Sequence, residues 1–560
     1  MLTIYGKKKE PEFGSNSPFR IYVDQAGYLP DSRKTAVIPF ETKVFAITDE
    51  NGDKHFEGEV THFGQDECSG DDVYIADFSA FRRPGSYRVT AEGKSSALFR
   101  ISDGVYKELF FDVTKAFYYF RCGCDLDKRF AGVYSHPRCH CGFAEILAEG
   151  GEVNVRGGWH DAGDYGRYVT AGACACAQLL YSYKLFPELF GKMNLNIPES
   201  GSGVPDILSE CRYELEWMLR MQRDDGAVYH KVTTMNHAPF IMPERDTDKL
   251  YVFNVSSSAT ADFCALCALA AGIYKDYDED FSKRLKRASV RAFNWLEEHP
   301  EPVIFFNPPG CNTGVYSEEF DFDNRYWAAA ELYSLTGEKR YHDLFLAIYG
   351  SPFFEGRSYL KTSLGYMNIG GLGSLAYIMC RNEDKNSGIS RQLADLFATE
   401  AYWLADKYKK SGYGAALEDW EYYWGSNMVL LHHGIKFVLA AMLTNDNEFY
   451  TCAEEQLHVL LGRNPLGISY VTGHGEYASR CPHYRPSAAD GIEESVPGLV
   501  IGGPNRDLSD SYAKTLIPAG TPPMRCYVDD ERCFSLNETT IYWNSPAVLL
   551  LAALESRKKN

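Results

Sequence analysis

The sequence lacks three features that would each assign it to a different class of protein. It has no run of 18 or more consecutive apolar residues, which predicts that no segment spans a membrane. The N-terminal stretch MLTIYGKKKEPEFGSNS has no long apolar run followed by a small-residue cleavage site. Residues 1–17 are therefore interpreted as a leader or an added remnant outside the fold, and not as a signal peptide. Basic charge is also scarce. With 57 Lys and Arg against 76 Asp and Glu, the formal net charge of −19 argues against nucleic acid or an anionic membrane as a partner.

Cysteine is not scarce, but its spacing does not resemble a small disulfide framework. The chain has 16 cysteines, several in alanine-rich helical surroundings such as TADFCALCALAAGIY, where buried thiols act as small apolar side chains. This usage favours a reducing compartment or an anaerobic source. The sequence itself assigns no localisation.

The chain shows two different sequence patterns, and its 560 residues are more than a single hydrophobic core usually includes, which predicts two domains. Residues 18–103 show short alternating stretches, among them KTAVIPF and GSYRVTA, separated by turn signals roughly every ten residues, which predicts an all-β sandwich. Residues 104–560 show long helical patterns with short loops, which predict an α-hairpin toroid or a solenoid. Long Gly- and Pro-rich loops such as 461–525 favour a closed barrel whose loops build a cleft.

Carboxylates stand out in two places. The stretch VRGGWHDAGDYGRYVT (155–170) sets Asp161 and Asp164 three residues apart among glycines, and Glu538 precedes the last helical segment. A polar surface turn and a helix cap would explain each motif alone. Together they supply an acid and a base from distant parts of the chain, as glycoside hydrolysis requires.

A set of thiols and imidazoles surrounds the same loop. Cys122, Cys139, His140 and His160 have the ligand types of a closed tetrahedral zinc site, which would fasten the loop and leave no open coordination position. Cys124, Cys141 and His136 are alternative ligands, and unliganded reduced thiols are the simpler alternative.

A later loop offers hydrogen-bond donors. In ISYVTGHGEYASRCPHYRPS (468–487), His483 and Arg485 flank Tyr484, and their donors suit a hydroxyl-rich ligand. A surface position for this His-x-Arg pair is the ordinary alternative.

The segments GGWHDAGDYGRY, SYVTGHG…PHYRPS and YVDDERCFSLNETTIYWNSP, in this order, resemble the catalytic segments of glycoside hydrolase family 9, the inverting cellulases. The stretch VDQAGYLP and the predicted sandwich resemble the immunoglobulin-like module of one subgroup, and the resemblance covers about residues 19–556. It implies an (α/α)6 barrel and usually a secreted protein.

The resemblance also implies a role for each matching residue. Asp164 matches the general base, Asp161 the partner that holds the attacking water, and Glu538 the general acid. His483 and Arg485 match sugar contacts, and Trp159 and Tyr477 are taken as further substrate contacts. The set Cys122, Cys139, His140 and His160 matches the structural zinc site.

Two positions depart from the family pattern. Tyr477 stands where Asn, Lys or Arg is usual. Asp323-Asn324 replaces an Asp-Glu pair that can bind calcium in the family, so one hard ligand charge is missing and calcium affinity should fall.

The leading interpretation is an endo-acting β-1,4-glucanase that acts on cellulosic or related β-glucans with inversion. The alternatives are an exo-acting cellodextrinase or β-glucosidase, or a glucanase for xyloglucan or mixed-linkage chains. A non-catalytic carbohydrate-binding protein would be expected to lack Asp164 or Glu538, and a helical scaffold leaves the three loop segments unexplained. The expected partner is a β-1,4-linked glucan, with no protein partner evident.

Overall fold

The computed structural model describes residues 20–355 and 357–557, so the segment 1–17 that the sequence assigns to a leader lies outside the described residues. The chain forms two compact units. The first combines the residues up to Ala116 with those from Ala401 onward, and the second is Phe117–Glu400. Helices α1 (Lys107–Tyr119) and α13 (Ser387–Lys410) run across the two boundaries.

The first unit begins with a sheet domain, as the alternating pattern predicts. Its strand order is β1-β8-β6-β3-β4-β5-β2, with β7 paired to β6, and all pairs are antiparallel except β1 with β8. The strands are β1 (Gly27–Tyr28), β2 (Thr35–Ile38), β3 (Val44–Thr48), β4 (Lys54–Asp66), β5 (Asp71–Asp77), β6 (Gly85–Ala91), β7 (Lys94–Ser95) and β8 (Phe99–Ile101). Alternate side chains such as Phe45, Ile47 and Val89 point into one apolar core.

Helices from the C-terminal third complete this unit. They are α14 (Ser426–Thr444), α15 (Glu448–Leu460), α16 (Arg485–Ala489), α17 (Ala513–Leu516), α18 (Phe534–Asn537) and α19 (Ile541–Ser556), with short 3-10 turns η3 (Asp419–Glu421) and η4 (Pro523–Arg525). Helix α14 packs against both α15 and α19. Nearly every residue of α19 is buried, because its sequence is apolar on all sides.

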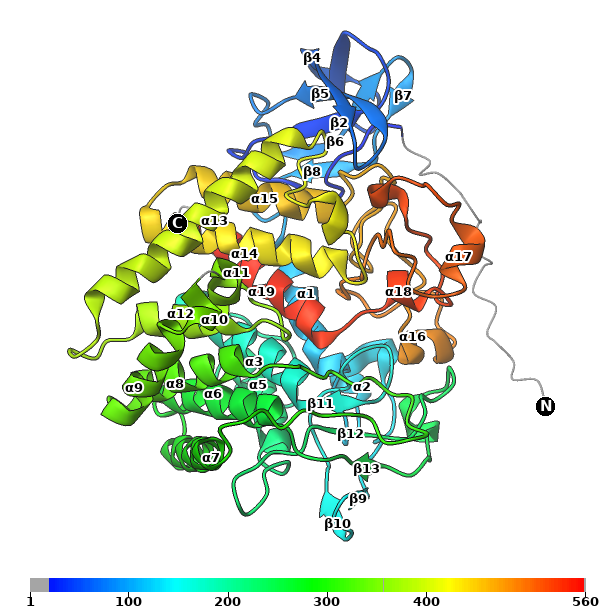
Figure 1. The fold of residues 1–560 in the computed structure, drawn as a ribbon. Helices are drawn as coiled ribbons and strands as arrows, with labels where there is room; N and C mark the ends of the chain where they lie inside the picture. Colours follow the sequence, from blue (N-terminus) through cyan, green and yellow to red (C-terminus); the bar gives the residue numbers. More distant parts are fainter. Residues whose placement is uncertain (1–19, 356, 558–560) are drawn as a thin grey trace. The chain divides into compact units, whose positions relative to one another are not determined.

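The second unit consists of helical hairpins and a small sheet (Figure 1). The longer helices are α3 (Val169–Leu185), α5 (Asp206–Met218), α6 (Ser257–Tyr274), α7 (Glu279–Glu298), α8 (Phe322–Thr336), α9 (Lys339–Tyr349) and α12 (Gly370–Met379). The short ones are α2 (Lys128–Ala131), η1 (Gly132–Tyr134), α4 (Pro187–Gly191), η2 (Pro243–Arg245), α10 (Pro352–Glu355) and α11 (Ser358–Thr362). The sheet order is β10-β9-β13-β12-β11, from β9 (Phe143–Ile146), β10 (Glu152–Asn154), β11 (Arg167–Tyr168), β12 (Lys231–Thr233) and β13 (Tyr251–Val252).

The long helices of this unit divide into buried and amphipathic ones. Helices α3, α6 and α8 are buried over most of their length, and α6 packs against both others. Helix α7 buries only one stripe, which includes Phe281, Leu285 and Leu296, against α6. Buried helices inside and amphipathic helices outside give the unit a layered helical core.

Two helices, α6 and α14, are long and apolar enough to cross a membrane by length and composition. Their apolar windows are 94% and 78% buried inside the protein, which is the environment of core helices. Helix α6 carries Cys264 and Cys267, and none of the 16 cysteines of the chain is in a disulfide.

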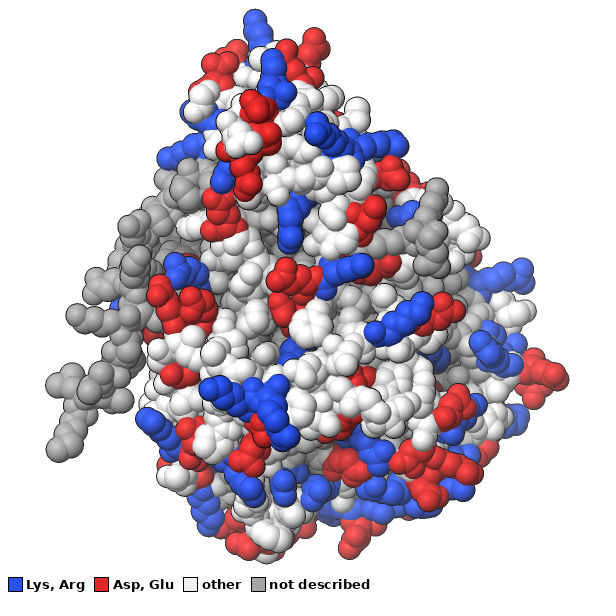
Figure 2. Space-filling model, turned by 180° about the vertical axis from the view of Figure 1, so that it is seen from behind, with Lys and Arg blue, Asp and Glu red and all other residues white. Residues whose placement is uncertain are grey.

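Charged side chains of both signs are interspersed on the face drawn in Figure 2. The excess of acidic residues in the composition does not collect there into one large patch. Interspersed charge gives that face no continuous basic footprint of the kind a nucleic acid needs.

Candidate active site

The Asp161 loop is held by backbone pairing to the end of α1. Cys122 N donates to Gly158 O at 2.8 Å, and His160 N donates to Phe120 O at 2.8 Å. Gly158 has a φ of +77°, and a Cβ there would lie 2.8 Å from the Trp217 ring. Glycine at this position is therefore required both by the backbone conformation and by the close approach of the indole.

A buried carboxyl supports the same loop. Glu214 on α5 accepts a hydrogen bond from Trp159 N at 2.7 Å. Burial raises the pKa of Glu214 to about 8, although the Trp159 hydrogen bond and the charge of Arg167 oppose the rise. The loop backbone thus rests on a fixed polar group inside the second unit.

Asp161 is buried, and one of its oxygens is already engaged. Tyr316 Oη donates to Asp161 Oδ2 at 2.5 Å, while Asp161 Oδ1 is buried with no hydrogen-bond partner among the described residues. Burial raises the pKa of Asp161 well above its usual range, partly offset by the Tyr316 hydrogen bond. Tyr316 has a φ of +46°, a strained value for a residue with a side chain, of the kind that collects at functional sites.

Asp164 is surrounded by donors. Its Oδ2 lies 3.2 Å from each of three groups: the Gly166 amide, the Tyr168 hydroxyl and His237 Nδ1. Donors that favour the ionised form keep a carboxylate available as a base. Asp161 and Asp164 are both buried in one loop, but one oxygen of Asp164 meets three donor groups, whereas Asp161 accepts one side-chain hydrogen bond, from Tyr316.

Sequence reasoning missed Tyr168, His237 and Tyr316. Tyr168 is four residues from Asp164 inside the quoted motif and could have been noticed there. His237 and Tyr316 lie far along the chain, in segments without a recognisable motif, and only folding brings them to the two aspartates.

The four predicted metal ligands converge. One ligand atom from each of Cys122, Cys139, His140 and His160 falls within 4.8 Å of all the others. His160 Nε2 lies 3.3 Å from His140 Nδ1 and 3.8 Å from Cys139 Sγ. Bond lengths of about 2.0–2.3 Å around a tetrahedral zinc place ligand atoms roughly 3.3–3.8 Å apart, so the set fits this ion.

Further groups support this set. His140 Nε2 lies 3.3 Å from Asp246 Oδ2, the carboxylate–histidine arrangement that orients metal ligands. The Tyr165 ring lies 5.4 Å from the His140 ring and 4.9 Å from the His160 ring. Tyr165 follows Asp164 directly in the sequence. Through Tyr165, the predicted metal ligands therefore contact the loop that carries the predicted base.

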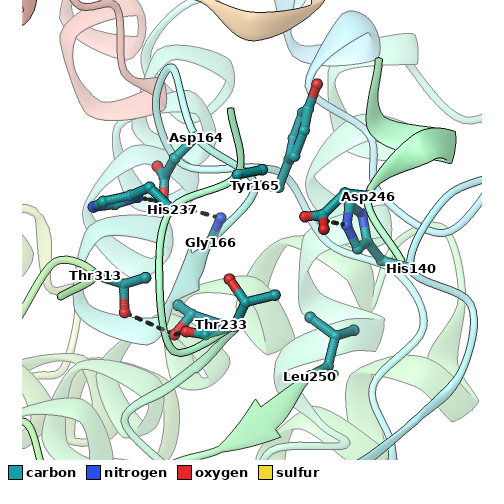
Figure 3. Close-up of a pocket in the computed structure, with 11 residues that line it drawn as sticks. His140, Asp164, Tyr165, Gly166, Thr233, His237, Asp246, Leu250 and Thr313 are labelled. Atoms are coloured by element: carbon teal, nitrogen blue, oxygen red, sulfur yellow. Dashed lines mark hydrogen bonds and ion pairs between the residues drawn. The ribbon is translucent and has the colours of Figure 1, made fainter. Parts of the chain in front are cut away.

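A pocket joins the two groups of residues within the second unit (Figure 3). Asp164 and His237 line one side of the view and the His140–Asp246 pair lines the other, with Tyr165 between them. Thr233 and Thr313 line it as well, and their hydroxyls lie 2.8 Å apart. The pocket is polar and presents hydroxyl and carboxylate groups next to the predicted base.

Glu538 lies in the first unit and is part-buried at the junction of α18 and α19. Its carbonyl accepts from Gly502 N at 2.9 Å, and the neighbouring Asn537 carbonyl accepts from His483 N at 2.7 Å. The Thr540 side chain caps α19 through Trp543 N. The structure thus brings His483 and Glu538 together as bridge partners, although 55 residues separate them.

The remaining predicted substrate contacts differ in position. Arg485 is the first residue of α16 and is 7% exposed, and Tyr477 is part-buried. Trp159 is 1% exposed with its ring packed 5.0 Å from that of Phe117. Its indole has no face open to a ligand, which corrects the predicted substrate role: this residue packs the interior behind the loop.

The Asp323-Asn324 pair lies in a buried cluster of oxygens. Asn324 Nδ2 donates to Asp262 Oδ1 at 3.0 Å and lies 3.4 Å from Glu318 Oε2, while Asp323 Oδ2 accepts from Ile369 N at 2.7 Å. An amide donor therefore occupies the space between two carboxylates. Asp262 Oδ2, Glu318 Oε1 and Asn324 Oδ1 are buried without a hydrogen-bond partner among the described residues, so the cluster keeps oxygens of the kind that calcium takes, with an amide in place of one carboxylate charge.

Asp164 lines a polar pocket, Asp161 lies in the same loop, and Glu538 stands at a helix junction. These carboxyl groups are the types that an acid–base glycoside hydrolase uses. Residues 106–551 match the profile of "Glycosyl hydrolase family 9", and residues 16–96 match that of "Cellulase N-terminal ig-like domain". The chain therefore belongs to glycosyl hydrolase family 9.

Individual relatives cover nearly the whole chain. A cellodextrinase of Butyrivibrio fibrisolvens is 44% identical, over 96% of this chain and 99% of its own. A thermostable endoglucanase of Alicyclobacillus acidocaldarius has a TM-score of 0.89 at 33% identity, over 96% of this chain and 100% of its own. A zinc-binding triple mutant of the family 9 endoglucanase J30 has a TM-score of 0.89 at 34% identity, over 95% of this chain and 100% of its own.

Proposed function

We propose that the protein is an endo-acting β-1,4-glucanase that hydrolyses cellulosic or related β-glucan chains with inversion at the anomeric carbon. Asp164 is the general base, Asp161 positions the attacking water, and Glu538 is the general acid. The observation that carries the proposal is the contrast between the two aspartates: three donors meet one oxygen of Asp164, whereas Asp161 keeps a buried oxygen without a partner among the described residues.

In this mechanism a water molecule lies between the two aspartates. Asp161 Oδ1 holds the water, while the hydrogen bond from Tyr316 fixes the orientation of the carboxyl group. Asp164 takes a proton from the water as its oxygen attacks the anomeric carbon. Glu538 gives its proton to the departing glycosidic oxygen from the opposite face of the sugar.

We propose an (α/α)6 barrel for the helical part of the chain. The buried helices α3, α6, α8, α14 and α19 would form the inner layer, and amphipathic helices such as α7 the outer one. We also propose the domain limits 18–103 for the immunoglobulin-like module and 104–560 for the barrel. His483 and Arg485 would contact the sugar at the cleavage point, and Tyr477 would lie further along the chain of sugars.

We propose that Cys122, Cys139, His140 and His160 hold one structural zinc. Bound there, zinc would supply cross-linking and no catalytic water, because four protein ligands fill a tetrahedral shell. The distances between the ligand atoms and the Asp246 partner of His140 support this assignment.

A second activity, exo-acting cellodextrin hydrolysis, is favoured by one finding: the 44% identical relative is a cellodextrinase. An endo-acting enzyme lowers the viscosity of carboxymethylcellulose quickly and releases mixed products from cellohexaose. A cellodextrinase leaves the viscosity nearly unchanged and shortens cellohexaose from one end. Lichenan and xyloglucan, tested in parallel, assign the preferred glucan.

Substitution of the acid and the base tests the mechanism. Asp164→Asn and Glu538→Gln should each lower kcat by roughly 10²–10⁴-fold, the usual contribution of general acid–base catalysis, with melting temperatures close to wild type. Glu494→Gln, at an exposed position, is the matched control. The first product seen by NMR should be the α-anomer, and Asp164 and Glu538 should lie about 6.5–9.5 Å apart in a substrate complex. A β-anomer appearing first would overturn the mechanism.

A further inference from the structure

Several aromatic side chains between residues 403 and 424 are unusually exposed. Trp403 is 51% exposed, Trp420 63%, Tyr423 37% and Trp424 39%. Aromatic side chains have a large apolar surface that folding usually buries. A cluster of exposed aromatic side chains therefore indicates a binding surface. The mechanism proposed above uses none of them.

Trp403 on α13 and Trp420 in η3 are joined by one lysine. Lys407 Nζ lies 3.7 Å from the centre of the Trp403 ring and 5.8 Å from that of Trp420. The two ring centres are therefore no further apart than the sum of these distances, which is close to the length of two sugar units. We call this pair the Trp403–Trp420 platform.

The platform rests on a rigid polar base. Lys407 is itself buried and bonds Glu421 Oε2 at 2.9 Å, and the same carboxyl group accepts from His433 Nε2 at 3.0 Å and Glu418 N at 2.8 Å. These hydrogen bonds fix the position of Lys407, and Lys407 in turn contacts and orients the two exposed rings. Preorganised aromatic side chains bind with little loss of conformational entropy.

The segment that carries Trp420 also leads to the predicted active-site residues. The Trp424 ring lies 5.1 Å from that of Phe534, whose ring lies 6.1 Å from that of His483. Four residues span at most about 14 Å, so Trp420 lies only a few sugar lengths from Trp424. The segment that carries Trp420 therefore leads within four residues to a chain of ring contacts that ends at His483, the predicted sugar contact.

We propose that the Trp403–Trp420 platform is an auxiliary binding surface for a β-1,4-glucan chain that extends beyond the cleavage site. The inference rests on the proposed function. The flat apolar faces of glucosyl rings suit indole faces, while the carboxylates at Glu418 and Asp419 can accept hydrogen bonds from sugar hydroxyls. Glu418 and Asp419 pair with Lys407 and Arg506, so the charges around the rings are balanced, which fits a neutral polysaccharide.

The test measures polymer binding apart from catalysis. In the Glu538→Gln protein, migration through native gels containing neutral hydroxyethylcellulose should be strongly retarded. Adding Trp403→Ala and Trp420→Ala together should weaken this binding roughly tenfold. Tyr402→Ala, which removes the 56% exposed neighbouring ring, should leave it unchanged. Trp420→Tyr should retain most of the binding, because a stacking face remains.

Activity separates the platform from the catalytic site. In the otherwise wild-type enzyme, the double variant should keep kcat/KM on cellotriose within about twofold and lose several-fold on the polymer. Retardation equal to the parent in both the double variant and Trp420→Ala would overturn the proposal. So would a dimer, seen by light scattering, that the double variant loses. Failure of the proposed function would appear elsewhere, as cellotriose hydrolysis by Glu538→Gln.

Discussion

Gln25, two residues before β1 in the VDQAGYLP stretch, makes a specific connection within the first unit. Its side-chain Nε2 donates to Gly467 O at 2.8 Å and to Tyr477 O at 3.2 Å, and its Oε1 accepts from Tyr477 N at 2.7 Å. The side chain therefore holds both polar groups of the Tyr477 backbone. Tyr477 belongs to the loop that continues to His483, so the N-terminal sheet domain fixes a loop of the predicted active site.

Gln25→Ala removes all three hydrogen bonds at once. Gln25 is 7% exposed, and each buried polar group left without a partner costs about 1–3 kcal/mol. Tyr477 O keeps its hydrogen bond from Ser469 N at 2.9 Å, so two groups, Gly467 O and Tyr477 N, lose the Gln25 partner and the free energy of unfolding should fall by about 2–4 kcal/mol. Gly462 packs closely against this side chain, since a Cβ there would meet Gln25 Nε2 at 2.5 Å.

The measurement is urea unfolding followed by tryptophan fluorescence, combined with kinetics on cellohexaose. Gln25→Ala should unfold at lower urea and show a higher KM, because the loop that carries Tyr477 loses its support. Gln25→Glu should be no better, since a carboxylate would face two carbonyl oxygens. Gln65→Ala, at an exposed position of the same sheet, is the control. Stability of Gln25→Ala within about 0.5 kcal/mol of wild type would refute the reasoning.

Three other predictions concern metal and pH. Cys139→Ser should lower the zinc content, the melting temperature and kcat together, whereas Cys141→Ser should keep one zinc per chain; a fully active wild-type enzyme without metal would disprove the site. Burial raises the pKa of Glu454, which accepts a hydrogen bond from Ser32 Oγ at 2.6 Å, from 4.5 to about 7. The folded protein therefore favours the protonated carboxyl group, and this contribution to the free energy of unfolding is complete below about pH 4.5 and lost as pH rises through 7. Glu454→Gln should therefore gain stability relative to wild type between pH 5 and 8, by up to roughly 3 kcal/mol, and a constant difference across this range would contradict the assignment. Asn324→Glu would add a charge beside two buried carboxylates and so restore a calcium ligand. The difference in melting temperature between calcium and EGTA should therefore be larger for this variant than for wild type, and equal differences would contradict the idea that Asn324 lowers calcium affinity.

Local sequence signals predicted much of the fold and part of the site. Alternation in the N-terminal segment predicted the sheet domain, because strands with one buried face repeat every two residues. The spacing of Asp161, Asp164 and His160 placed an acid pair beside a predicted metal ligand, since residues so close in sequence must share a loop. The metal set also converged as predicted. These features are encoded within short segments.

Tertiary structure decided which side chains surround those groups. Tyr316 and His237 reach the aspartates across 155 and 73 residues, and nothing near them in sequence signals this. Trp159 adjoins a predicted metal ligand in sequence, yet its ring is 1% exposed and packs against Phe117. Gln25 reaches Tyr477 across 452 residues. Local propensity can specify a loop or a strand, but the burial and hydrogen-bond partners of a side chain depend on long-range packing, which no short segment determines.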